Sequence, residues 1–265
     1  MLTTDFVNGS PRWIELGSDS PEASADFYKR VFRWEAESGG ARVGDYPIMR
    51  SDGGNVAGIG ARIVDEEAQS WTVYFQVDDI EATARRVREL GGTLQVEPTE
   101  VFELGTVAHA TDSQGGWFAL WQPGTFVGME VTDRPGALCW VQLWTTSVQS
   151  AEDFYRDLFG WRCVDIPLAD EETYTMARPS GAGEDRYFGG MMEMPPVQLP
   201  QIEGFADWHP VFQAADCDAV AASVRDSGGR VHVGPHDVPG VGRLAVCSDP
   251  LSAGFVILEP LNGHL

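Results

Sequence analysis

Two stretches of this 265-residue chain repeat each other, and this duplication constrains the fold more than any other feature. The segment WIELGSDSPEASADFYKRVFRW, which begins at Trp13, matches WVQLWTTSVQSAEDFYRDLFGW, which begins at Trp140, at an offset of 127 residues. Further on, WTVYFQVDD from Trp71 matches WHPVFQAAD from Trp208 at an offset of 137 residues. The second copy therefore holds ten additional residues, for which the proline- and glycine-rich stretch 179–200 is the natural place. Such a repeat predicts two homologous halves.

Each half contains the same order of elements twice. In the first half, a strand over Trp13–Gly17 precedes a helix over Pro21–Phe32, for which Ser20 is the expected N-cap. Three short strands are expected next: Arg42–Val43, Tyr46–Arg50 and Val56–Ile63. The pattern then restarts with a strand over Trp71–Val77, a helix over Ile80–Leu90, and strands over Thr93–Val96, Val107–Ala110 and Trp117–Trp121. The sequence predicts an α+β protein made of four βαβββ modules.

Several motifs recur in register in the two halves, among them SPEASADFY and SVQSAEDFY after a strand, and DSQGGWFALW and DPLSAGFVILEP near the ends. They resemble the vicinal oxygen chelate superfamily, which holds glyoxalase I, bleomycin-resistance proteins, fosfomycin-resistance enzymes and extradiol dioxygenases. NGSPRWIEL and GPHDVPGVGRLAVCSDP are most similar to the two-half glyoxalase-like proteins of actinobacteria, which include a mycobacterial antigen. The resemblance implies tandem domains with curved mixed sheets over residues 1–122 and 136–265, joined by a linker over residues 123–135. Because the fused halves would mimic a dimer, we expect a monomer or a weak homodimer.

The resemblance also implies where a metal would bind. The superfamily uses one histidine from the first strand of one module, a second from the first strand of the next, and a glutamate from that module's last strand, a ligand set that suits a divalent cation. The corresponding positions here are Trp13, Thr72 and Ala119 in the first half and Trp140, His209 and Val256 in the second. The remaining histidines lie without useful spacing: His109, His232, His236 and His264. We therefore predict no metal, no cofactor, and no metal-dependent glyoxalase or dioxygenase activity.

Aromatic side chains stand where the metal ligands would be. Residues two apart on a strand face the same side of a sheet, and the family geometry implies that this side is the concave one. The expected ligand-binding residues are Trp13, Tyr74, Trp117 and Trp121 in the first half, and Trp140, Gln142 and Trp144 in the second. Indole walls with a few polar groups suit a flat aromatic molecule, and an acidic field favours a neutral or cationic one. Aromatic residues that alternate along a strand in this way are equally typical of a packed hydrophobic core.

Two titratable residues share these faces. Glu15 lies on the same side as Trp13, and an inward carboxylate is costly unless it is paired or solvated. It is either the ion-pair partner of a strand arginine such as Arg50 or Arg62, or a general base whose pKa burial has raised. His209 is the second candidate acid or base, although a core histidine bonded to a backbone carbonyl is the commoner case.

The net charge and the cysteine content limit the binding partners and the cellular compartment that we expect. With 18 basic and 40 acidic residues the net charge is −22, which repels nucleic acid and anionic lipid, so neither is expected as a partner. The start of the chain shows no signal-peptide pattern. The four cysteines, Cys139, Cys163, Cys217 and Cys247, have no metal or redox spacing. We expect reduced thiols in a cytoplasmic protein.

Three functions are compatible with these features. The first is metal-independent binding of an aromatic or polycyclic metabolite or antibiotic, as in bleomycin-resistance proteins. The second is a metal-free isomerase, cyclase or lyase that uses Glu15 or His209 to transfer a proton. The third is a non-catalytic accessory protein whose clefts are closed. The sequence favours the first.

Overall fold

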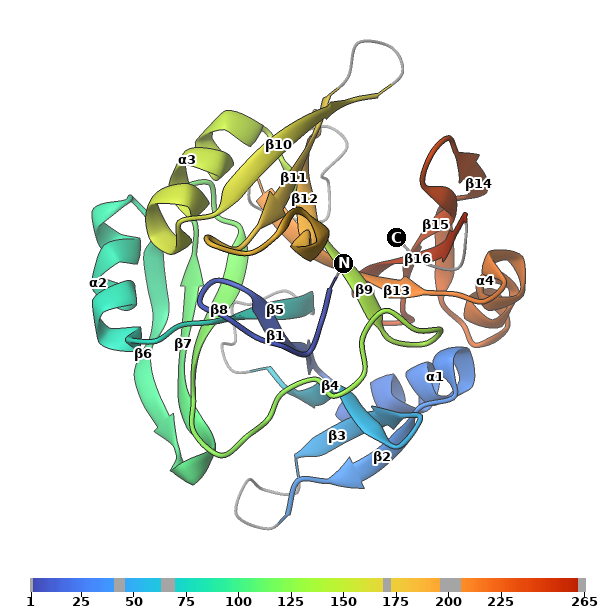
Figure 1. Ribbon diagram of the computed structural model, residues 1–265. Coiled ribbons are helices and arrows are strands. Elements are labelled where there is room, and N and C mark those ends of the chain that lie inside the picture. The colour runs from blue at the N-terminus through green and yellow to red at the C-terminus, as the bar shows by residue number, and fades with distance from the viewer. Residues whose placement is uncertain (1, 41–45, 63–69, 169–172, 196–205, 262–265) are drawn as a thin grey trace. The chain divides into compact units, whose positions relative to one another are not determined.

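The computed structural model describes residues 2–40, 46–62, 70–168, 173–195 and 206–261 (Figure 1). Its strands form two eight-stranded mixed sheets, one from each half of the sequence. The strand order is β2-β3-β4-β1-β5-β8-β7-β6 in the first and β10-β11-β12-β9-β13-β16-β15-β14 in the second. The two orders correspond strand for strand. The predicted α+β class and the four repeated βαβββ modules are therefore confirmed.

The first half contains these elements: β1 (Pro11–Ser18), α1 (Pro21–Phe32), β2 (Glu35–Ser38), β3 (Pro47–Ser51), β4 (Gly54–Ala61), β5 (Ser70–Gln76), α2 (Ile80–Glu89), β6 (Thr93–Val101), the short 3₁₀ helix η2 (Phe102–Leu104), β7 (Gly105–Thr111) and β8 (Trp117–Pro123). The helices agree with the predicted ranges within one residue. The strand expected over Arg42–Val43 lies outside the described residues. Strand β2 was not predicted, because its four exposed residues carry no apolar alternation.

The second half repeats the series: β9 (Leu138–Thr145), α3 (Val148–Phe159), β10 (Arg162–Pro167), β11 (Thr173–Arg178), η4 (Glu184–Arg186), β12 (Gly189–Glu193), β13 (Ala206–Gln213), α4 (Cys217–Asp226), β14 (Arg230–Val238), β15 (Gly242–Ser248) and β16 (Gly254–Pro260). Within the range described, no helix is long and apolar enough to cross a membrane. All four cysteines are free.

The helix starts differ in how they are capped. Asp79, Ser147 and Asp216 each accept a hydrogen bond from a backbone N–H of the first turn of α2, α3 and α4. Ser20 lies at the N-cap of α1 as predicted, but its side chain makes no cap hydrogen bond, so the predicted side-chain capping is wrong. Pro21 occupies the first turn and removes one of the free N–H groups.

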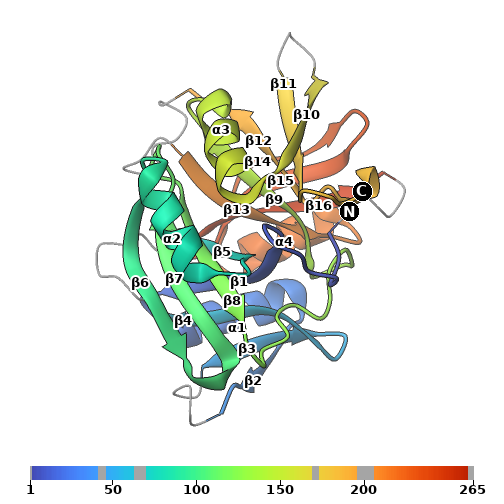
Figure 2. The same cartoon turned by 60° about the vertical axis from the view of Figure 1, so that its left-hand side comes forward.

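The side chains pack into two compact units that cut across the repeat. One unit comprises Met1–Arg12, Thr72–Val127 and Val141–Trp208; the other comprises Trp13–Trp71, Gly128–Trp140 and His209–Leu265. Each unit therefore combines a module of the first half with a module of the second. Figure 2 shows part of the first unit, where α2 lies along β6, β7 and β8.

Each unit is built around an aromatic core to which both halves contribute. In the first unit, Phe75 lies 5.5 Å from Trp208 between ring centroids, and Tyr155 accepts a hydrogen bond from Trp208 and donates one to buried Asp112 (2.8 and 2.9 Å). In the second unit, Tyr28 accepts from Trp71 (3.1 Å) and packs 5.7 Å from Phe255. The repeated Phe-Tyr pairs of the sequence thus form the contacts that join one half's module to the other's.

Candidate functional site

In the first unit, three adjacent strands place Tyr74, Ala119 and His109 side by side. Tyr74 of β5 is the register partner of Ala119 on β8, and Ala119 is in turn the partner of His109 on β7. Trp117 and Trp121 lie two residues before and after Ala119 and share its face of the sheet. The predicted grouping of Tyr74 with both tryptophans is thus consistent with the register.

Ring contacts connect these side chains into one continuous row. The ring centroids of Trp117 and His109 lie 6.0 Å apart, those of His109 and Tyr74 5.6 Å, and those of Tyr74 and Trp121 6.5 Å. Phe126 follows at 6.0 Å from Trp121. We call these five residues the aromatic row. Three of these pairs are edge-to-face, and the Trp117–His109 pair is tilted.

His109 is the central member of the aromatic row and is only 2% exposed. Burial lowers its pKa from 6.5 to about 4, so the imidazole is neutral at pH 7. Its Nε2 atom lies 3.5 Å from the Tyr74 hydroxyl. Its Nδ1 atom is buried and has no hydrogen-bond partner in the described structure.

Other buried donors lie along the same row. The indole nitrogens of Trp117 and Trp121 are buried and unpaired within the part of the chain that the structure describes. Arg12 bonds the Gln76 side chain (2.5 Å) and the Phe126 carbonyl (3.2 Å), while its Nε atom is also buried without an acceptor there. Burial lowers the pKa of Arg12. A buried donor left without an acceptor costs about 1–3 kcal/mol.

In the second unit, Glu15 is held by a tyrosine. The Tyr46 hydroxyl donates to Glu15 Oε2 at 2.7 Å and accepts from the Trp13 indole at 3.4 Å. Gly58 of β4 makes room for this hydroxyl, since a Cβ at that position would lie 1.6 Å from it. Burial and the Glu15 charge raise the pKa of Tyr46 well above its usual value, so the phenol stays protonated.

The two arginines weighed as partners for Glu15 contact other residues. Arg50 bonds Glu37 and the Gly53 carbonyl, and Arg62 pairs with Asp19 at 2.6 Å. The contacts of Glu15 described above therefore join it to Trp13 through Tyr46, as the shared strand face predicts.

The second half repeats this arrangement with an amide in place of the carboxylate. The Tyr174 hydroxyl donates to Gln142 Oε1 at 2.6 Å, and Gly190 leaves room for the ring, because a Cβ there would lie 2.5 Å from it. Trp144 is half-buried opposite Met192, and Trp140 is half-buried on the same strand. The two halves thus carry the same tyrosine hydrogen bond, but only the first has a titratable partner.

His209 packs over a glycine. A Cβ on Gly254 would lie 3.1 Å from both Nε2 and Cδ2 of His209, and the histidine is 7% exposed.

The other titratable residues of the second half include a buried cysteine and two further histidines. Burial raises the pKa of Cys247 to about 12, which keeps it a thiol rather than a nucleophilic thiolate. His232 bonds Ser248 at 2.9 Å, and His264 lies outside the described range.

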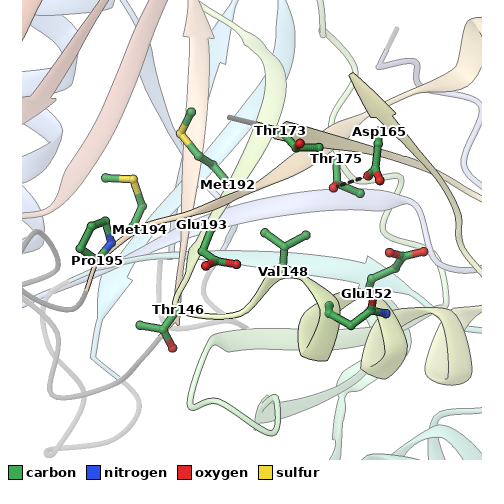
Figure 3. A pocket seen from close by; sticks show the side chains of 11 residues that line it. Thr146, Val148, Glu152, Asp165, Thr173, Thr175, Met192, Glu193, Met194 and Pro195 are labelled. Atoms are coloured by element: carbon green, nitrogen blue, oxygen red, sulfur yellow. Dashed lines mark hydrogen bonds between the residues drawn. The ribbon is translucent and has the colours of Figure 1, made fainter. Parts of the chain in front are cut away.

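A separate pocket of about 610 Å³ opens beside α3 in the first unit (Figure 3). Glu152, Asp165 and Glu193 line it together with Met192 and Met194. Thr175 donates to Asp165 at 2.7 Å, as the dashed line in Figure 3 shows. None of the residues singled out from the sequence lines this pocket.

Comparison with known proteins establishes the family. Residues 13–120 match the glyoxalase-like domain family, and residues 137–257 match the family described as glyoxalase/bleomycin resistance protein/dioxygenase superfamily. The anthracycline biosynthesis protein DnrV of Streptomyces peucetius is 33% identical over 98% of this chain and 97% of its own length. The chain belongs to the glyoxalase/bleomycin resistance protein/dioxygenase superfamily. This confirms the resemblance drawn from the motifs.

Further relatives of this superfamily member agree with the assignment. The putative glyoxylase CFP32 of Mycobacterium tuberculosis is 30% identical over 97% of both chains. Among solved structures, the 2,3-dioxygenase LapB from Pseudomonas sp. KL28 superimposes with a TM-score of 0.65 at 14% identity, covering 96% of this chain and 93% of its own. The Mn(II)-bound glyoxalase from Novosphingobium aromaticivorans gives 0.63 at 14% identity, covering 97% and 86%. These structures share the fold.

The residues at the superfamily's metal positions do not fit a metal. In the first half they are an indole, a hydroxyl and a methyl group: Trp13, Thr72 and Ala119. In the second half, Val256 takes the carboxylate position, and His209 is the single possible ligand. Across the described ranges, no three His, Cys, Asp or Glu side chains converge on a point that could hold a metal ion.

His109 is the residue that the sequence analysis missed. It lies on the strand before the one that carries the family's carboxylate position, and the spacing of the histidines along the chain does not mark it. A signal was present in the turn DSQGG, because a hairpin centred on Gln114 brings residue 109 opposite residue 119.

Proposed function

We propose that this protein binds a planar aromatic small molecule along the aromatic row of its first half, without a metal ion. The observation that carries the proposal is the unbroken series of ring contacts from Trp117 to Phe126, which includes buried polar ring edges without partners in the described structure. Aromatic rings with a few oriented donors are the usual make-up of a small-molecule site. Its expected place of action is the cytoplasm.

The relatives support the same class of ligand. DnrV of Streptomyces peucetius and DauV of Streptomyces sp. strain C5, each 33% identical to this chain, are both named anthracycline biosynthesis proteins. Anthracyclines contain fused planar rings that include a quinone. A polycyclic aromatic metabolite is therefore the ligand class proposed for this chain.

Tryptophan fluorescence tests the proposal directly. Titration with anthraquinone-2-sulfonate in buffer containing EDTA is expected to give saturable quenching at micromolar concentration. Trp121→Ala should weaken binding at least tenfold, whereas Tyr187→Ala, which removes a half-buried aromatic ring of the second half, should leave the affinity unchanged. Absence of quenching in the wild type, or equal affinities for the two variants, would overturn the proposal and favour an accessory protein with closed clefts.

The Tyr46–Glu15 hydrogen bond favours a second candidate, a metal-free isomerase, cyclase or lyase. Glu15 would accept a proton from a carbon acid, and Tyr46 would hold the carboxylate in position. His209, packed over Gly254, is the weaker candidate for this role. Glu15→Gln reproduces the Gln142 arrangement of the second half, so it should abolish turnover and leave the fold intact. Unchanged turnover would remove Glu15 as the base.

A further inference from the structure

The aromatic row contains donors without matching acceptors. The Nδ1 atom of His109 and the indole nitrogens of Trp117 and Trp121 have no partner among the described residues. The neighbouring side-chain acceptor, Gln76 Oε1, already receives a hydrogen bond from Arg12. Buried donors are nearly always satisfied in native proteins, so such an excess indicates that the acceptors come from elsewhere.

The contact between the Tyr74 hydroxyl and His109 Nε2 allows either atom to donate, depending on the tautomer of the imidazole. When the Tyr74 hydroxyl donates to Nε2, the proton of the neutral imidazole lies on Nδ1, and Nδ1 becomes a donor. His109, Trp117 and Trp121 then all present N–H groups. Arg12, which bonds Gln76 opposite Trp121, adds a positive charge near that end of the row.

We propose that these N–H groups bind the carbonyl oxygens of an aromatic ketone or quinone. His109 and Trp117 would hold one oxygen, and Trp121, next to Arg12, would hold a second. This inference rests on the proposed function and specifies the ligand's chemistry. Among the neutral or cationic aromatic ligands expected from the net charge, it selects those with oxygen acceptors.

The place of His109 in the sheet supports the proposal. Its register partner is Ala119, the position where the superfamily resemblance implies a metal-binding carboxylate. At this position, related enzymes would hold substrate oxygens with a metal ion. In this chain, the methyl group of Ala119 lies beside the neutral imidazole of His109. Oriented N–H donors in a site shielded from water stabilise an electron-rich oxygen in the same sense as a cation does.

Two probes that differ only in their oxygens test the inference. Anthraquinone-2-sulfonate and anthracene-2-sulfonate share a planar three-ring skeleton and a sulfonate, so shape and repulsion by the acidic protein affect both alike. Because the quinone ring is poorer in electrons and stacks differently, the variants below separate hydrogen bonding from stacking. The wild type is expected to bind the quinone at least tenfold more tightly. His109→Phe keeps a ring but removes the donor, and should weaken quinone binding about five- to tenfold without weakening anthracene binding. Trp117→Phe should act in the same way.

Infrared spectroscopy distinguishes hydrogen bonds to the ligand's carbonyl groups from packing against its rings. The carbonyl stretch of the bound quinone should lie at lower frequency in the wild type than in His109→Phe, while Tyr187→Phe, which removes a hydroxyl outside the row, should match the wild type. Equal wild-type affinity for the two probes, or an equal loss of both in His109→Phe, would overturn the inference and leave the aromatic row as a stacking surface. Failure of both probes to bind the wild type would overturn the proposed function and the inference with it.

Discussion

The burial of His109 couples the stability of the protein to pH. The pKa of its imidazole is about 4 in the folded state and 6.5 in a solvated chain. Between these values the unfolded state binds the proton and the folded state does not, so the free energy of unfolding falls as the pH falls through this window. The loss is about 1.4 kcal/mol per pH unit, or about 2 kcal/mol at pH 5.

His109→Phe isolates this effect, because the ring is retained while the titration is removed. Urea unfolding at pH 7.5 and pH 5.0 should show the wild type losing about 2 kcal/mol more than the variant. Burial also raises the pKa of Asp112, which acts with the opposite sign, but that residue is common to both proteins and cancels in the comparison. Parallel pH dependences in the two proteins would contradict the assigned burial of His109.

At the same scale, residues were predictable wherever strand alternation alone decided which way a side chain faces. Tyr74, Trp117 and Trp121 could be grouped in this way, and so could Trp13 with Glu15. Tyr46 and His109 could not, because their places depend on the register between neighbouring strands. That register is set by turn geometry, which single-strand alternation does not record.

At the scale of elements, one glycine on a neighbouring strand leaves the space for each of the two tyrosines, Tyr46 and Tyr174. A Cβ on Gly58 would lie 1.6 Å from the Tyr46 hydroxyl, and one on Gly190 would lie 2.5 Å from the Tyr174 ring. Gly58→Ala should displace Tyr46 from Glu15 and lower the free energy of unfolding by about 1–3 kcal/mol. Gly190→Ala should do the same to Tyr174 and Gln142.

A double-mutant cycle checks this cause. If the clash with Tyr46 accounts for the loss, Gly58→Ala should cost little in a Tyr46→Ala background, and the two single effects should not add. Chemical denaturation of the four proteins measures the coupling. Additive effects would mean that the alanine disturbs β4 itself rather than the tyrosine.

The elements themselves were largely predictable, because amphipathic periodicity identifies them. Helices α1 and α2 match their expected ranges within one residue, whereas β6 continues to Val101, five residues beyond the predicted end at Val96. Its register shifts between Leu94 and Val96 and between Val96 and Thr99. Bulges of this kind interrupt simple alternation and hide the rest of a strand from sequence reading.

At the scale of the whole molecule, hydrogen bonding and packing divide the chain differently. Each eight-stranded sheet belongs to one half of the sequence, but each compact unit takes one module from each half. The duplicated sequence predicts the sheets, since strands and helices recur in order. The packing partners follow from side-chain contacts between the halves, such as Phe75 with Trp208 and Tyr28 with Phe255, which the repeat alone does not specify.

An isolated half should therefore fail to remain a folded monomer. Residues 1–135 alone would lack Phe212 and Phe255, whose rings lie 4.8 and 5.9 Å from Phe32, and would leave that apolar face uncovered. We expect the fragment to self-associate, and to recover the near-ultraviolet circular dichroism of the intact chain only when residues 136–265 are added. Light scattering after size exclusion measures the first, and titration of one fragment with the other measures the second. A stable monomer with native aromatic signals would show that one half completes its own core, so that the contacts between halves add stability but are not required for folding.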